Sequence, residues 1–127
     1  MSTEIQSLKE RAVSFLQLVV SGEVRIAYER YVGSDFRHHN PFFPGDADSL
    51  MLAMEEDATQ NPHKILEVKL AIQENDTVSV LSHLKLITDD PGVALVHIFR
   101  FQDNQIVELW DINQSVPDPS PNKNGMF

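Results

Sequence analysis

Asp111 is the residue whose type and setting point most directly to chemistry. It lies in the segment Ile-Val-Glu-Leu-Trp-Asp-Ile at residues 106–112, whose alternation predicts a strand with Asp111 and Asn113 on one face. A carboxylate that faces an apolar interior loses hydration and becomes a stronger base, as a general base near neutral pH requires. The alternative is that Asp111 pairs with Arg37, with Arg100 or with a backbone donor.

Histidines are the next candidates, because imidazole can donate or accept a proton near neutral pH. His97 and His83 fall in two predicted strands, and either could reach an interior polar site. His38 and His39 precede Asn40, and we expect one of the two to point inward and the other to face water. A histidine on an apolar strand is more often structural than catalytic. No two of the five histidines are four residues apart and there is no His-Glu-x-x-His motif, so we expect no metal site.

Aromatic and methionine side chains could line an apolar cavity for a flat ligand. The candidates are Tyr28, Tyr31, Phe42, Phe43, Met51, Met54 and Trp110. Periodicity alone favours the simpler interpretation that they are core. The sequence has neither a glycine-rich phosphate loop nor a Gly-x-Ser-x-Gly motif, so nucleotide cofactors and serine hydrolysis lack support.

The first half of the chain has helical periodicity. Apolar residues at three-to-four spacing predict helices over residues 3–21, 23–32 and 47–59. Thr3 and Gln6 could form a capping box for the first helix, Gly33 should end the second, and Asp46 or Asp48 should cap the third. Residues 34–45 contain two prolines and no apolar period, which predicts an irregular but packed connection.

The second half alternates with a period of two. It predicts four strands joined by short polar turns, starting near Leu66, Val78, Val93 and Gln105. Short hairpins force antiparallel pairing, so the expected fold class is α+β, with three N-terminal helices on a curved, mainly antiparallel four-strand sheet. Such a sheet, wrapped around the first helix, forms a cone with a cavity at its open end.

Bulk composition narrows the classes of partner. The 127 residues fit one domain, in which residues 117–127 should form an extended C-terminal arm. Nineteen acidic against ten basic side chains give a net charge of −9, which disfavours nucleic acid and anionic membranes as partners. There is no cysteine, no basic segment ahead of an apolar run and no apolar stretch long enough to span a bilayer, so we expect a cytoplasmic protein.

Taken together, several segments resemble the SnoaL-like polyketide cyclase family of the nuclear transport factor 2-like superfamily. They are Phe-Arg-His-His-Asn-Pro at residues 36–41, Val-His-Ile-Phe-Arg-Phe at 96–101, Ile-Val-Glu-Leu-Trp-Asp at 106–111 and Gln-x-Val-Pro at 114–117. The ending Asn-Lys-Asn-Gly-Met-Phe is also similar. The resemblance implies a cystatin-like cone and a homodimer formed through the outer face of the sheet.

The resemblance also implies a reaction without cofactor or metal. The aspartate matching Asp111 would remove a proton α to a carbonyl, so that an aldol condensation closes a ring. His97, His83 and His39 would stabilise the enolate or return the proton, and an asparagine would help to position it. The sequence departs from the family pattern at Leu81, Leu109 and His97.

Two classes of function therefore stay open, because one fold hosts many functions. The first is an enzyme that cyclises or isomerises a small carbonyl compound with Asp111 as base. The second is a non-catalytic, dimeric domain in which Asp111 and the histidines hold a polar ligand. A purely structural dimer module, with side chains filling the cone, is a third alternative.

Overall fold

The computed structural model describes residues 6–127. Its elements are α1 (Leu8–Val20), α2 (Val24–Tyr31), β1 (Val32–His38), α3 (Ala47–Gln60), β2 (Ile65–Glu74), β3 (Thr77–Lys85), β4 (Val93–Gln102) and β5 (Gln105–Ser115). The α+β class with three helices is as predicted. The sheet, however, has five strands and is mixed, where four strands were expected.

The helix α1 begins later than its apolar period predicts. Its N-cap is Ser7, whose hydroxyl accepts from the Glu10 N–H at 3.1 Å while the Glu10 carboxylate accepts from the Ser7 N–H at 2.8 Å. The capping box expected for Thr3 and Gln6 is not used by this helix, since Gln6 precedes it; Thr3 itself lies outside the described residues. Gly22, at φ +93°, ends α1 in a left-handed conformation.

The chain passes from α2 directly into β1, and here the prediction was wrong. Residues 32–38 form a strand, whereas residue 32 was expected to end a helix and residues 34–38 to begin an irregular connection. Gly33 does not end the helix: it lies in β1, where a Cβ would come within 3.3 Å of the Gln105 Cβ. A glycine therefore lets β1 approach β5 closely at this point.

The helix α3 and the four later strands match their predictions closely. Asp46 is the N-cap of α3, with its carboxylate accepting from the Ser49 N–H at 2.9 Å, and Asn61 follows the last helical residue. Asn75, Asp103 and Asn104 take positive φ in the two tight turns that separate β2 from β3 and β4 from β5.

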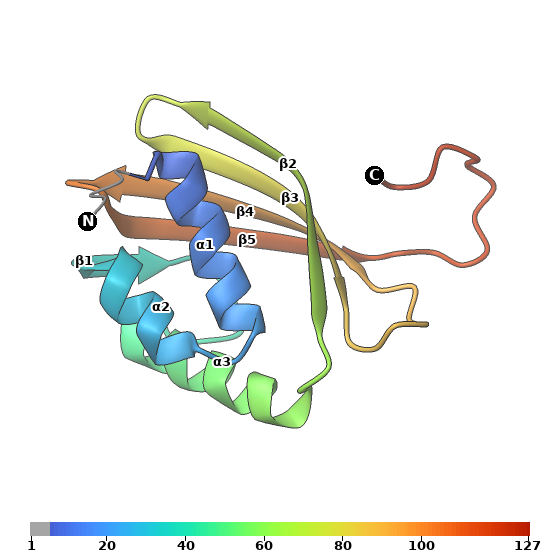
Figure 1. Cartoon of the computed structure of the whole chain (residues 1–127), viewed down its shortest axis with the longest axis horizontal. Helices are drawn as coiled ribbons and strands as arrows, with labels where there is room; N and C mark the ends of the chain where they lie inside the picture. Colours follow the sequence, from blue (N-terminus) through green and yellow to red (C-terminus); the bar gives the residue numbers. More distant parts are fainter. Residues whose placement is uncertain (1–5) are drawn as a thin grey trace, which may run out of the picture.

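The strand order is β1-β5-β4-β3-β2, with β1 parallel to β5 and every other pair antiparallel. The register of β2 against β3 shifts between Val68 and Leu70, as in a β-bulge. Figure 1 shows the long strands curving around α1, with all three helices on one face of the sheet. The opposite, outer face carries no helix.

The core lies between α1 and the inner face of the sheet. Ala12, Phe15, Leu16 and Val19 are the buried residues of α1. The Phe15 ring packs against Tyr28 at 5.5 Å and edge-on against Phe99 at 6.0 Å, measured between ring centroids. This packing fills the space between α1, α2 and β4 with aromatic side chains.

The C-terminal arm, from residue 116 onward, contains neither helix nor strand. Figure 1 shows it running past the end of the sheet and turning back. Its last residue, Phe127, stacks on His83 at 4.5 Å between ring centroids. Within residues 6–127, no helix has the length and apolar character needed to cross a membrane.

Candidate functional site

A cavity of about 380 Å³ lies between the C-terminal half of α1, the helix α3 and the inner face of the sheet. Apolar side chains make up most of its wall, among them Leu16, Phe43, Leu50, Met54 and Leu66. The polar residues that line it are Asn40, Asp57, Lys64, His97, Asp111 and Asn113. A mostly apolar cavity with a few polar groups is the usual form of a small-molecule site.

Asp111 and His97 form the centre of this polar set. They are directly opposite each other in the antiparallel register of β5 against β4, which places their side chains side by side on the inner face. The next pair along the same face is Asn113 opposite Leu95, and both also line the cavity. Strand pairing therefore fixes the geometry of all four residues.

His97 is held in its neutral form. Burial lowers its pKa to about 4, although the charge of Asp111 acts in the opposite direction. The Nδ1 atom of His97 has no hydrogen-bond partner among residues 6–127. The ring can therefore act as a neutral hydrogen-bond donor beside the carboxylate.

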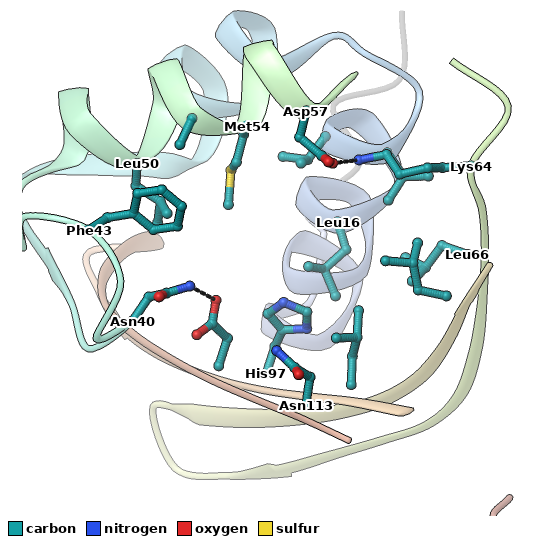
Figure 2. A pocket seen from close by; sticks show the side chains of 16 residues that line it. Leu16, Asn40, Phe43, Leu50, Met54, Asp57, Lys64, Leu66, His97 and Asn113 are labelled. Carbon is teal, nitrogen blue, oxygen red and sulfur yellow. Dashed lines mark hydrogen bonds and ion pairs between the residues drawn. The ribbon is translucent and has the colours of Figure 1, made fainter. Parts of the chain in front are cut away.

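Asn40 connects the loop after β1 to Asp111. Its Nδ2 donates to the Asp111 carboxylate at 3.1 Å (Figure 2). Its Oδ1 accepts from the Phe42 N–H at 3.0 Å. The Asn40 N–H donates to Nδ1 of His38, whose Nε2 lies 2.6 Å from the Pro44 carbonyl oxygen. Of the two adjacent histidines, His38 is thus the buried, structural one.

Tyr28 does not line the cavity but lies close behind it. Its hydroxyl is 3.4 Å from the Met54 Sδ atom, and Met54 is part of the cavity wall. Burial raises the pKa of Tyr28 well above its usual value, and the charge of Asp111 raises it further. The phenol therefore stays protonated and neutral behind the cavity wall.

At another part of the cavity wall, Lys64 forms an ion pair with Asp57. The Lys64 side chain is only 5% exposed, whereas that of Asp57 is 48% exposed. Asp57 also accepts from Asn61 Nδ2 at 2.9 Å. Sequence reasoning missed this pair, because nothing in the polar segment around Pro62 indicates that Lys64 is buried.

Comparison with known proteins identifies the fold. No protein-family model and no curated protein matches the sequence. Solved structures do match. A proposed polyketide cyclase from Bacillus cereus is 17% identical, with a TM-score of 0.72 over 84% of this chain and 74% of that chain. A proposed isomerase of the SnoaL-like family from Agrobacterium tumefaciens is 8% identical, with a TM-score of 0.70 over 86% of this chain and 99% of that chain.

The chain has the SnoaL-like fold. An uncharacterised cystatin-fold protein from Novosphingobium aromaticivorans matches equally well, at 19% identity and a TM-score of 0.69 over 85% of this chain and 99% of that chain. The cystatin-like fold expected from the sequence is thereby supported.

Within this SnoaL-like fold, only part of the predicted site converges. The residues that meet in the cavity are Asp111, His97, Asn40, Asn113, Phe43 and Met54. His39 lies on the outer face, where its Nε2 is 2.7 Å from the Glu108 carboxylate and its ring stacks on Trp110 at 4.9 Å. His83 is also outside the cavity, with its Nε2 2.7 Å from the Pro91 carbonyl oxygen.

Two further aromatic candidates lie elsewhere. Tyr31 is buried beside the N-terminal half of α1, where its hydroxyl lies 2.8 Å from that of Ser14. Phe42 is 84% exposed. Within residues 6–127, no three or more His, Asp or Glu side chains are grouped so that they could hold a metal ion.

Arg37 and Arg100, considered as partners of Asp111, instead both pair with Glu108 on the outer face. Their Nε atoms lie 3.1 Å and 3.0 Å from its carboxylate oxygens. The hydrogen bond from His39, together with those from the two arginines, lowers the pKa of Glu108 to about 2, against the effect of burial. Asp111 is therefore left with an amide partner and no ion pair from either arginine.

Proposed function

We propose that this protein abstracts a proton α to the carbonyl group of a small, mostly apolar substrate, leading to aldol-type cyclisation or to isomerisation. The observation that carries the proposal is the cross-strand pair of Asp111 and neutral His97 at the wall of a mostly apolar cavity. A base beside a neutral donor is the arrangement that enolisation needs.

In this proposal Asp111 takes the proton, and the electrons of the broken C–H bond move into the enolate. We assign the ring proton of His97 to Nε2, because an unpaired buried N–H at Nδ1 would be the costlier state. His97 then donates to the enolate oxygen, and the Asn113 amide is a second donor. In cyclisation the enolate carbon attacks a second carbonyl, and the protonated Asp111 returns its proton to the new alkoxide.

The structural neighbours support a reaction of this class. They include a proposed polyketide cyclase and a proposed isomerase of the SnoaL-like family. No cofactor is needed for proton transfer from a carbon that a carbonyl already acidifies, so we propose that the reaction uses none. The partner of the site is then the small-molecule substrate alone.

The second candidate is a non-catalytic ligand-binding domain. The hydrogen bond from Asn40 to Asp111 favours it, because a carboxylate with a fixed amide donor can simply hold a polar ligand. The two candidates differ in whether bound ketone exchanges its α-protons.

The test uses 2-tetralone, a neutral bicyclic ketone, with ¹H NMR recording loss of its α-proton signals in D₂O. We expect the wild-type protein to accelerate exchange and Asp111→Asn to reduce the acceleration about 100-fold or more. The matched control is Asp103→Asn, in the β4–β5 turn where Asn tolerates the positive φ. This variant should accelerate the exchange of 2-tetralone as much as the wild type does.

Binding without exchange would contradict the enzyme proposal. If 2-tetralone perturbs the NMR signals of cavity residues but its exchange is no faster with wild-type protein than without protein, the ligand-binding domain is the better description. Unchanged exchange in Asp111→Asn would instead exclude Asp111 as the base.

A further inference from the structure

Lys64 is the only lysine or arginine side chain that lines the cavity in the part of the chain the structure describes. Its side chain is 5% exposed. A buried ammonium must keep an anionic partner, since an unpaired charge in such a place is strongly unfavourable. In the absence of ligand, Asp57 is that partner.

Asp57 can release Lys64 at little cost. Its side chain is 48% exposed, so water can take the place of the ammonium. It also keeps its hydrogen bond from Asn61 Nδ2 at 2.9 Å. Lys64 has neither alternative, so an entering carboxylate can replace Asp57 as its partner.

The polar groups of the cavity form two separate ends. Figure 2 shows Lys64 with Asp57 at one end and Asn40, His97 and Asn113 at the other, with Leu16 and Met54 between them. Because the Asp111 carboxylate repels an anion, a carboxylate-bearing ligand has one favourable orientation, with its charge at Lys64 and its apolar part across Leu16 and Met54.

We propose that Lys64 is the specificity residue for a carboxylate on the ligand, and that the ligand class is an apolar ring carrying a carboxylate at one end. This assignment rests on the proposed function for the carbonyl group, which then lies at the Asp111 end. The preference for a carboxylate does not depend on turnover. Asp57 is the protein group that competes with the ligand carboxylate for Lys64.

The experiment compares two ligands of equal shape, 1-naphthaleneacetate and 1-naphthaleneacetamide, by isothermal titration calorimetry. We expect the wild-type protein to bind the carboxylate about tenfold more tightly than the amide, as a charge-assisted hydrogen bond provides. Lys64→Gln should bind both within about twofold. Asp57→Asn, which removes the competing carboxylate, should bind 1-naphthaleneacetate more tightly than the wild type.

Controls separate charge recognition from folding. Lys64→Arg keeps the charge and should retain the preference, and it remains informative if Lys64→Gln fails to fold. Lys69→Gln removes a lysine that pairs with Glu67 outside the cavity, and should bind both ligands like the wild type. If Lys64 and Asp57 form only a structural ion pair, neither Lys64→Gln nor Asp57→Asn should change the ratio of the affinities for the two ligands.

Failure of this inference and failure of the proposed function give different results. Equal affinity for the two ligands in the wild type, no binding of either at millimolar concentration, or an undiminished preference in Lys64→Gln would overturn the role of Lys64. Asp111→Asn should keep the carboxylate preference while losing the exchange of 2-tetralone. Loss of exchange activity therefore does not affect this test.

Discussion

His97 couples the site to the stability of the protein. Its pKa falls to about 4 in the folded state because the ring is buried, against about 6.5 in the unfolded chain. Above about pH 6.5 both states hold the neutral ring and the stability is unaffected. As the pH falls toward 4, the unfolded chain binds a proton first, so the folded state loses stability.

We therefore expect His97→Gln to show a smaller loss of unfolding free energy than the wild type between about pH 7.5 and pH 5. From these two pKa values, the difference attributable to His97 is about 2 kcal/mol. Urea unfolding followed by circular dichroism at both pH values measures it. Equal losses in the two proteins would show that His97 is not desolvated in the folded state.

The residues of the site differ in how far the sequence reveals them. Asp111, His97 and Asn113 were predictable, since a polar residue in an alternating apolar strand must share the face of its second neighbours. Lys64 was not, because it lies in an irregular connection where no periodicity reports burial. His83 has strand-like spacing yet faces outward, because alternation gives two faces without saying which one is inner. His39 lies just after β1, in the segment predicted as an irregular connection, where no alternation indicates its direction.

At the scale of elements, Glu108 joins three strands on the outer face. Arg37 belongs to β1, Arg100 to β4 and Glu108 to β5, and Glu108 is buried although both arginines are partly exposed. These ion pairs fix an edge strand, β1, that has few apolar residues of its own. Sequence periodicity did not predict β1, because Gly33, Ser34 and Asp35 disfavour strands. The strand β1 is stabilised by its pairing with β5, which is distant in the sequence.

Glu108→Gln should lower the free energy of unfolding by about 2 kcal/mol, because charge-assisted hydrogen bonds to a buried carboxylate are lost. The matched control is Glu67→Gln on β2, whose carboxylate is half exposed and pairs with Lys69, and which should destabilise the protein much less, because water screens the pair. Urea unfolding near neutral pH compares the two. Equal effects would show that the Glu108 cluster does not hold β1 in place.

The pH dependence of this contribution has a definite sign. The pKa of Glu108 is lowered from 4.5 to about 2 in the folded state, so its stabilisation is complete above about pH 4.5 and is lost as the pH falls through 2. The Glu108→Gln variant should therefore approach the wild type in stability as the solution becomes strongly acidic.

At the scale of the whole molecule, the outer face of the sheet carries a continuous apolar row. The strand registers align Leu70, Leu81, Val96 and Ile112 across β2, β3, β4 and β5. Leu70 is 51% exposed and Ile112 is 65% exposed. Since the helices cover the other face, we propose that two copies associate through this row, as the resemblance implies.

Replacing Ile112 by lysine should then shift the protein from dimer to monomer, because the charge would be buried at the contact. Leu52→Lys is the control, since Leu52 is 54% exposed on α3 and lies away from the sheet. Analytical ultracentrifugation measures both. A wild-type protein that sediments as a monomer would contradict the proposed dimer.

The β-bulge in β2 has a consequence for the protein in crowded solution. As the last strand of the sheet, β2 has backbone groups facing away from β3 that another chain could use to extend the sheet. The register shift between Val68 and Leu70 interrupts this line of donors and acceptors, and Glu67 and Lys69 add charge beside it. Edge-to-edge polymerisation through β2 is thereby disfavoured, although the outer face of the sheet is apolar.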